Sequence, residues 1–269
     1  MNAFVVREGT SPIVLGMPHV GMDVPEALAP RFNAKGRAIA DTDWWIDQLY
    51  DGLLADTTVV RATFSRYVID ANRDPSGASL YPGQNTTGVC PTTTFDGDTI
   101  YEAGQEPDDD EIAERAATFH APYHAALSEQ IARVQAKHGV CVLYDCHSIR
   151  STIPYLFEGR LPVFNIGTNG GETCDTRIES AVKSVCEKAD GFDHAVNGRF
   201  KGGWTTRRYG QPNKGVHAVQ MELAQRVYMD EAPPWTYRPE RAAAVRAHLK
   251  EILSRLERLA LDGHLPSPI

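Results

Sequence analysis

The residues of this sequence best suited to chemistry each lie at or just past the end of a short apolar run. They are His19, His147 and Glu222, which follow or close the runs 13–17, 140–145 and 216–222. Such runs predict buried strands, and the ligands of an open α/β sheet collect at the carboxyl ends of its strands. Two imidazoles and a carboxylate meeting there indicate a metal-dependent hydrolase rather than a passive scaffold.

Two histidines and one carboxylate would form a three-ligand site that leaves the fourth position of a zinc ion open for water, as in catalytic zinc sites. A lone histidine in a turn is more commonly structural, so the prediction depends on the pair. The carboxylate is Asp41 or Asp43, although either would also suit the N-cap of a following helix. We favour Asp43, and Asp23 is a weaker candidate. Asp145, two residues before His147, could orient an imidazole.

Glu222 closes an apolar run, where a carboxylate is costly unless it is paired, protonated or faces a cavity. An ion pair with a nearby arginine is the structural explanation. The chemical explanation is a general base that takes a proton from water and returns it to a leaving amine.

Arginines recur in segments expected at strand ends or in the Gly-rich stretch 197–215. Each one alone would more commonly be solvated surface, but arginine forms forked bonds to carboxylates, so several together suit a dicarboxylate substrate. The segment Asn197–Gly203 lacks the spacing of a phosphate-binding loop. Candidate substrate-binding residues are Arg66, Arg73, Arg150, Asn197, Arg199, Arg207 and Tyr209, with Lys201 and Arg208 as further polar groups.

Strands and helices alternate along the chain, which predicts a single α/β domain over 1–269 with a mostly parallel or mixed sheet flanked by helices. The irregular segments 74–107 and 197–215 are expected to form walls or loops that close over a substrate. Expected strands are 13–17, 57–63, 66–70, 140–145, 163–166, 192–196 and 216–222. Expected helices are 44–54, 108–137 with a kink near Pro122, 173–188 and 239–261.

The composition is that of an ordinary soluble protein, and the net charge of −8 argues against nucleic-acid or anionic-membrane partners. No run approaches the roughly 20 apolar residues of a membrane helix, and the apolar stretch 3–6 is too short for a signal peptide. The five cysteines form no CxxC pair, which indicates reduced thiols. We therefore expect a cytoplasmic protein with a small-molecule substrate; its oligomeric state stays open.

Several segments, in order over about residues 10–235, together resemble the N-formylglutamate amidohydrolase family. A mild departure is Cys146, where a small residue is expected. The matching segments are Met17–Gly21, Asp41–Trp44, Ser65–Arg73, Asp145–Arg150, Asn197–Gly210 and His217–Leu223.

The resemblance implies hydrolysis of N-formyl-L-glutamate to L-glutamate and formate, a reaction of histidine degradation, at a divalent metal with zinc as the expected ion. It implies a fold akin to zinc carboxypeptidases, of the phosphorylase/hydrolase-like class. His19, Asp43 (or Asp41) and His147 would then hold the metal, and Glu222 would act as the base. Two alternatives remain: a zinc peptidase or cell-wall amidase-like hydrolase of another acyl-amino acid, and a non-catalytic carboxylate-binding module.

Overall fold

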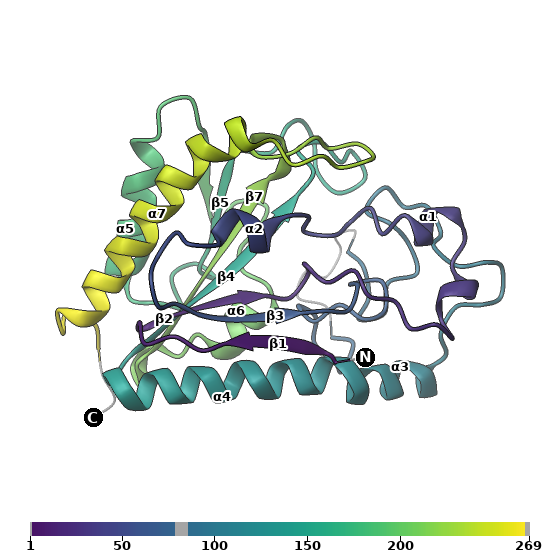
Figure 1. Cartoon of the computed structure of the whole chain (residues 1–269), viewed down its shortest axis with the longest axis horizontal. Coiled ribbons are helices and arrows are strands. Elements are labelled where there is room, and N and C mark those ends of the chain that lie inside the picture. Colours follow the sequence, from purple (N-terminus) through teal and green to yellow (C-terminus); the bar gives the residue numbers. More distant parts are fainter. Residues whose placement is uncertain (1, 79–85, 267–269) are drawn as a thin grey trace.

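A seven-stranded mixed sheet organises the protein in the computed structural model, which describes residues 2–78 and 86–266 (Figure 1). The strands are β1 (Phe4–Arg7), β2 (Ile13–Met17), β3 (Thr58–Ala62), β4 (Cys141–Ile149), β5 (Phe164–Gly167), β6 (His194–Val196) and β7 (Val216–Ala224). Their order across the sheet is β1-β3-β2-β4-β7-β5-β6. Strands β3, β2, β4 and β7 are mutually parallel, so their carboxyl ends share one edge. Strands β1 and β5 run antiparallel to β3 and β7.

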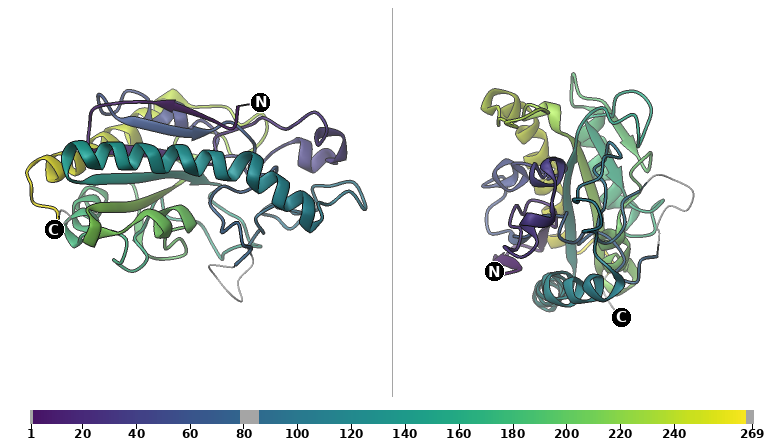
Figure 2. Two further views of the ribbon diagram at one scale, coloured as in Figure 1. Left: turned by 90° about the horizontal axis from the view of Figure 1, so that it is seen from below. Right: turned by 90° about the vertical axis from the view of Figure 1, so that its right-hand side faces the viewer.

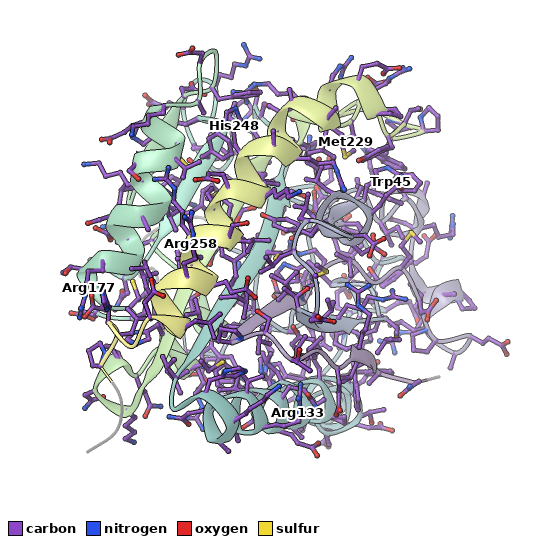
Figure 3. All side chains as sticks on the ribbon, turned by 60° about the vertical axis from the view of Figure 1, so that its left-hand side comes forward. Trp45, Arg133, Arg177, Met229, His248 and Arg258 are labelled. Atoms are coloured by element: carbon purple, nitrogen blue, oxygen red, sulfur yellow. The ribbon has the colours of Figure 1, made fainter. Side chains whose placement is uncertain are left out.

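Helices cover both faces of this sheet, which confirms the expected α/β fold (Figure 2). One face carries α4 and α6, and the other carries α2, α5 and α7. Figure 3 shows Arg133 on α4 and His248 and Arg258 on α7, on opposite sides of the sheet. The helices are α1 (Ala34–Arg37), α2 (Ile46–Tyr50), α3 (Asp109–Arg115), α4 (Ala121–His138), α5 (Thr176–Glu187), α6 (Trp204–Tyr209) and α7 (Pro239–Leu261).

Alternating side chains of the central strands build two apolar cores. Ile13, Leu15 and Met17 of β2 pack into the core beneath α2, α5 and α7, whereas Val14 packs into the core beneath α4. This follows from the two-residue period of a strand. Strands β4 and β7 are buried along their whole length, as expected for parallel strands covered on both faces. The sheet edge at their carboxyl ends is therefore held rigidly from both sides.

The long helical segment predicted at 108–137 is interrupted near Pro122, as expected. Asp108 caps α3 by accepting a hydrogen bond from the Glu111 backbone N–H at 2.9 Å. A π-helical segment, Ala116–His120, then joins α3 to α4, and Pro122 lies in the first turn of α4. The proline ring would clash with the carbonyl four residues earlier in a regular helix, and that residue lies inside the π-helical segment.

The expected strand 66–70 is wrong. Its residues form a compact turn in which the Val68 N–H donates to the Ser65 carbonyl at 2.9 Å. Arg66 and Asp70, four residues apart, form a buried ion pair at 2.8 Å. The pattern resembles a strand because the segment is buried, but its backbone and side chains are satisfied by this local ion pair and by neighbouring loops.

Other boundaries also differ. The helix expected at 44–54 shortens to α2, whose N-cap is Trp45 in the left-handed region, so neither Asp41 nor Asp43 caps it. The loop expected at 197–215 contains α6. Strands β4 and β7 extend past the predicted ends, so His147 and Glu222 lie within strands, and β1 was not foreseen.

All five cysteines are free and buried, as the sequence indicated. Among the described helices, none combines the length and hydropathy that a bilayer crossing requires.

Gly21, in the turn after β2, packs directly against the backbone that follows β3. A Cβ at this position would overlap backbone atoms of Thr63 and Phe64. We expect Gly21→Ala to lower the free energy of unfolding by about 1–3 kcal/mol, because neither backbone can move aside cheaply. Urea denaturation measures this loss. Gly88→Ala is the control, since its nearest neighbour would lie 3.8 Å away; equal stability of the two variants would contradict the packing described.

Candidate active site

His19, Asp43 and His147 meet at the carboxyl edge of the sheet. Their ligand atoms all lie within 4.8 Å of one another, and all three residues are buried. The Nδ1 atoms of His19 and His147 lie 3.6 Å and 3.2 Å from the same oxygen of Asp43, Oδ2. The two ring centroids are 5.0 Å apart. Both imidazoles thus turn the same nitrogen toward one carboxylate.

The sheet and one turn deliver these side chains. His19 lies two residues past β2, and its carbonyl accepts a hydrogen bond from the Asp43 N–H at 3.0 Å, which ties the two segments together. The Ser148 N–H donates to Asp43 Oδ2 at 3.1 Å. His147 on β4 is the register partner of Glu222 on β7. Parallel pairing therefore places the candidate base beside a candidate ligand.

The outer nitrogens of both imidazoles are held by polar side chains. His19 Nε2 lies 2.7 Å from Asp70, and His147 Nε2 lies 3.1 Å from Asp145 and 3.2 Å from the Asn72 amide nitrogen. An imidazole that donates from one nitrogen to a carboxylate presents the other as a ligand. Asp145 was anticipated in this role. Asp70 was not, although it lies in the segment Ser65–Arg73 that carried the family resemblance. The Asn72 amide nitrogen can only donate, so it bonds His147 Nε2 only when that atom carries no proton.

The charges in this cluster shift one another's protonation. Burial raises the pKa of Asp43, but His147 and His19 outweigh it and hold that pKa low. Burial also raises the pKa of Asp70, which His19 and Arg66 nonetheless hold well below its usual range. Burial lowers the pKa of His147, but Asp145 and Asp43 raise it well above the ordinary value. Without a cation, a proton on His147 thus neutralises part of the buried negative charge.

Glu222 is buried next to this cluster and lines the same cavity. Burial raises its pKa to about 8, and His147 opposes the rise. The Gln220 side chain donates to Glu222 Oε2 at 3.2 Å and accepts from the Gly203 N–H at 2.7 Å. A carboxyl group with a raised pKa accepts and releases a proton readily near neutral pH. A cation bound beside it would lower that pKa.

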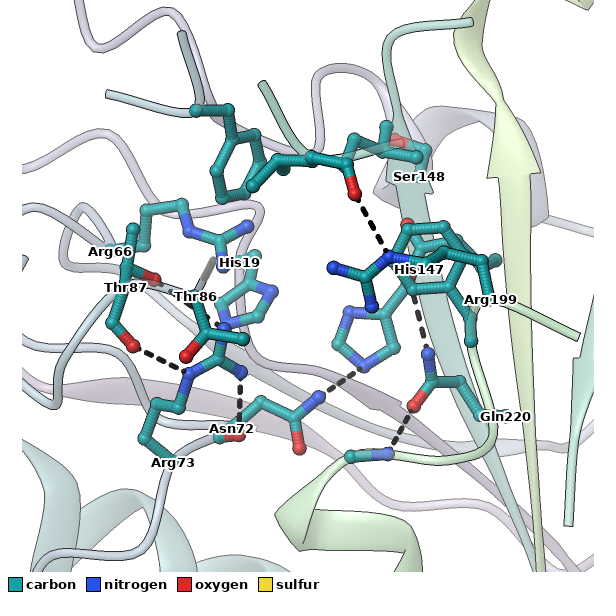
Figure 4. A pocket seen from close by; sticks show the side chains of 16 residues that line it. His19, Arg66, Asn72, Arg73, Thr86, Thr87, His147, Ser148, Arg199 and Gln220 are labelled. Atoms are coloured by element: carbon teal, nitrogen blue, oxygen red, sulfur yellow. Dashed lines mark hydrogen bonds between the residues drawn. The ribbon is translucent and has the colours of Figure 1, made fainter. Parts of the chain in front are cut away.

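A cavity of about 70 Å³ opens beside the cluster (Figure 4). His19, His147 and Glu222 contribute to its lining. Arg66 and Arg73 lie on one side, and Arg199 reaches in from the other. Arg66 is buried against Asp70, whereas Arg73 and Arg199 are partly exposed. The irregular segments contribute Thr86, Thr87 and Phe95 from 74–107, and Arg199, Phe200 and Gly203 from 197–215. Residues 79–85 of the first segment lie outside the described residues.

Comparison with known proteins identifies one family of amidohydrolases. The family model for N-formylglutamate amidohydrolase matches residues 11–229. The N-formylglutamate deformylase of Pseudomonas aeruginosa is 44% identical over 251 residues, which cover 93% of this chain and 94% of the relative. That of Pseudomonas putida is 42% identical over 251 residues, with the same coverage. The chain belongs to the N-formylglutamate amidohydrolase family. It is therefore an amide-cleaving hydrolase, not a non-catalytic binding module.

The fold of this family member is shared with a solved relative. The crystal structure of N-formylglutamate amidohydrolase from Ralstonia eutropha superimposes with a TM-score of 0.80, at 22% identity, and covers 98% of this chain and 100% of that one. At such identity the likeness concerns the fold alone.

Two aspartates weighed as ligands lie away from the imidazoles in this amidohydrolase. Asp41 accepts hydrogen bonds from the Tyr67 hydroxyl at 2.7 Å and the Phe95 N–H at 2.8 Å. Burial raises its pKa, although Tyr67 and Arg66 oppose the rise. Asp23 is exposed and its backbone pairs with Thr63. Of the three aspartates considered, Asp43 is the one beside both histidines.

Four other predicted substrate-binding residues lie outside the cavity lining. Arg150 pairs with Asp96 at 2.7 Å, and the Asn197 side chain accepts from the Thr168 N–H at 2.9 Å. Arg207 donates to the Gly202 carbonyl at 2.9 Å, and the Tyr209 hydroxyl contacts His124. These contacts hold the walls together.

The residues present fit a divalent cation. His19 Nδ1 and Asp43 Oδ1 are buried and make no hydrogen bond within residues 2–78 and 86–266. Two imidazole nitrogens and a carboxylate oxygen are the donor set that catalytic zinc prefers. The buried carboxylates around them supply the negative charge that a dication would balance.

Proposed function

We propose that this enzyme hydrolyses N-formyl-L-glutamate to L-glutamate and formate. The observation that carries the proposal is the juxtaposition, in one cavity, of Glu222, the His19–Asp43–His147 cluster and partly exposed arginines. The two Pseudomonas relatives, named for this deformylation, support the choice of amide. The reaction would belong to histidine degradation in the cytoplasm.

His19, Asp43 and His147 are the proposed holders of a divalent cation, with zinc favoured by the two nitrogen ligands. When bound, such an ion supplies Lewis acidity, which lowers the pKa of water and polarises an amide carbonyl. Asp70 and Asp145 then keep the two imidazoles deprotonated at Nδ1 and fixed in orientation.

Glu222 is the proposed general base and acid. It removes a proton from the water that attacks the formyl carbon, and it later delivers a proton to the glutamate nitrogen as the C–N bond breaks. Its burial and its contact with Gln220 favour a carboxyl group that changes protonation easily. Formate and the free amine are the products.

Arg73 and Arg199 are the proposed partners of the two substrate carboxylates. They lie on opposite sides of the cavity, so they can contact the two ends of a dicarboxylate (Figure 4). Arg66 is already paired with Asp70 at 2.8 Å, and its role is to fix Asp70 rather than to bind substrate. A cavity this small suits a small formyl amide better than a cell-wall strand. Assays with N-formyl-L-glutamate and with a muropeptide separate the two.

Asp43 and Asp41 can be distinguished by metal binding. We expect Asp43→Asn to weaken zinc by more than the about 10–100-fold that loss of a supporting hydrogen bond costs, since a ligand itself is lost. Asp41→Asn should bind zinc like the wild type, because an amide oxygen can still accept from Tyr67 and Phe95. Competition with a chromophoric chelator measures both. Wild-type zinc affinity in Asp43→Asn would overturn the ligand assignment.

Glu222→Gln should retain bound metal and lose turnover by about 10²–10⁴-fold, the contribution of a positioned general base. Formate release and metal content are measured on the same preparation. Glu114→Gln, at an exposed position of α3, is the control. Turnover within twofold of the control, with metal in place, would remove the role assigned to Glu222.

Replacing Arg73 or Arg199 by Met should reduce kcat/KM for N-formyl-L-glutamate by an amount equivalent to on the order of 2–5 kcal/mol, since one substrate carboxylate loses its partner. The exposed Arg208→Met is the control. N-formyl-L-norvaline lacks the side-chain carboxylate. The ratio of kcat/KM for N-formyl-L-glutamate to kcat/KM for N-formyl-L-norvaline should decrease in at least one variant. If both variants keep the wild-type ratio of kcat/KM for the two substrates, neither arginine binds the side-chain carboxylate.

A further inference from the structure

Two buried histidines outside the candidate metal cluster hold the backbone of one cavity wall. His120 ends the π-helical segment Ala116–His120, and His124 lies one turn later in α4. Both are buried, and their rings lie 4.4 Å apart between centroids. Neither lines the cavity described above.

Each histidine contacts a carbonyl of the segment that carries Asp70, Asn72 and Arg73. His124 Nε2 lies 2.7 Å from the Ala71 carbonyl, and His120 Nε2 lies 3.0 Å from the Arg73 carbonyl. A carbonyl accepts only, so both imidazoles donate from Nε2. The two imidazoles therefore bind the carbonyls of Ala71 and Arg73, the residues on either side of Asn72.

The protonation of His124 suits this role. Burial and the neighbouring His120 lower its pKa to about 3, so the ring is neutral and its proton resides on Nε2. Nδ1 is then an acceptor, and the Tyr209 hydroxyl lies 3.1 Å from it. The Ala71 carbonyl thereby fixes the tautomer, whereas the single proton of the Tyr209 hydroxyl can also be donated to the His124 carbonyl, 3.1 Å away.

The same histidines also contact α6, which follows the Gly-rich cavity wall. Trp204 packs edge-on against His124 with centroids 4.7 Å apart, and lies 5.2 Å from His120. The Thr205 N–H donates to the Asn72 side-chain oxygen at 2.9 Å. Gly203, directly before α6, lies so close to Asn72 that a Cβ there would overlap its amide. His120 and His124 therefore lie where α4, the segment around Asn72 and α6 meet.

The π-helical segment explains how one helix presents both donors. A π turn inserts an extra residue into the helical ladder and rotates the side chains that precede it relative to those that follow. His120 closes the π-helical segment and His124 belongs to regular α-helix. Their Nε2 atoms reach carbonyls two residues apart in one turn, which the Arg73 N–H closes by donating to the Asp70 carbonyl at 3.2 Å. Segments of this kind recur at functional sites.

We propose that His120 and His124 are positioning residues for substrate binding: they fix the backbone from which Asn72 and Arg73 enter the cavity. The inference rests on the proposed function for the identity of the substrate. Neither histidine touches the substrate or the reacting atoms. Their effect is transmitted through the carbonyls of Ala71 and Arg73.

The test compares His124→Leu, which removes the donor, with His124→Gln, whose amide nitrogen can occupy nearly the position of Nε2. We expect His124→Leu to raise KM for N-formyl-L-glutamate at least about tenfold, since a misplacement of about 1 Å can cost about 100-fold. All variants are assayed with zinc at saturation, because Asp70 and Asn72 of the same segment contact the proposed ligands His19 and His147. His124→Gln should restore most of the KM. A purely structural role would lower the melting temperature of His124→Leu and leave the KM of the folded enzyme at the wild-type value, so that His124→Gln would have no KM to restore.

His138→Leu is the matched control. His138 lies at the far end of the same helix, and its Nε2 also contacts a backbone carbonyl, that of Thr10, at 2.8 Å. It should leave KM unchanged. If His124→Leu does not fold, the same comparison of KM is made between His120→Leu and His120→Gln, which test the contact with the Arg73 carbonyl.

Hydrogen exchange separates failure of this inference from failure of the proposed function. The amides of Asn72 and Arg73 should exchange faster in His124→Leu than in His124→Gln, whatever the substrate. A wild-type enzyme that releases no formate from N-formyl-L-glutamate overturns the proposed function, while the exchange result still decides the positioning role. An active wild type with unchanged KM and unchanged exchange in the Leu variants overturns the positioning role alone.

Discussion

The burial of four carboxyl groups at one edge of the sheet is the constraint on which the rest of the site depends. Asp43, Asp70, Asp145 and Glu222 are all at most 7% exposed. An isolated buried carboxylate costs several kcal/mol, so such a group persists only where cations and donors compensate it. Here an imidazole, an arginine and a backbone N–H lie beside Asp43 and beside Asp70, while Asp145 contacts His147 and the Thr206 hydroxyl, and Glu222 contacts the Gln220 amide. A site of this composition favours cations and moves protons easily.

Much of this edge could be predicted from the sequence because it is built from local signals. The apolar runs that end near His19, His147 and Glu222 are strands in the structure, and parallel strands share their carboxyl edge. Family motifs covered the same residues. The mixed sheet and the long closing helix α7 also followed from periodicity, with Pro239 in its first turn.

The remainder could not be predicted because it depends on contacts between distant segments. Asp41 and Asp43 are both buried and two residues apart, and the sequence contains nothing to orient one rather than the other. The left-handed Trp45, held by its indole N–H to the Trp235 carbonyl at 2.6 Å, belongs to the turn that aims Asp43 inward. Arg66–Asp70 resembled a strand because burial alone produces the same pattern. Only the contact of Asp70 with His19, visible in the structure, shows that the segment is a turn that supports the cluster of His19, Asp43 and His147.

The charge balance of the cavity explains why a substrate with two carboxylates suits it. Arg66, Arg73 and Arg199, with a bound dication, would outweigh the four ionised carboxylates by one positive charge. A bound dicarboxylate would change this net charge from positive to negative, whereas a neutral amide would leave it unchanged. Arg66 pairs with Asp70 at 2.8 Å, whereas Arg73 lies 4.0 Å from that carboxylate and is partly exposed, so under the proposed function Arg73 and Arg199 would carry most of the attraction. Charge in a small, poorly solvated cavity is screened weakly, so under the proposed function this imbalance would discriminate between substrates more strongly than contact with the small formyl group can.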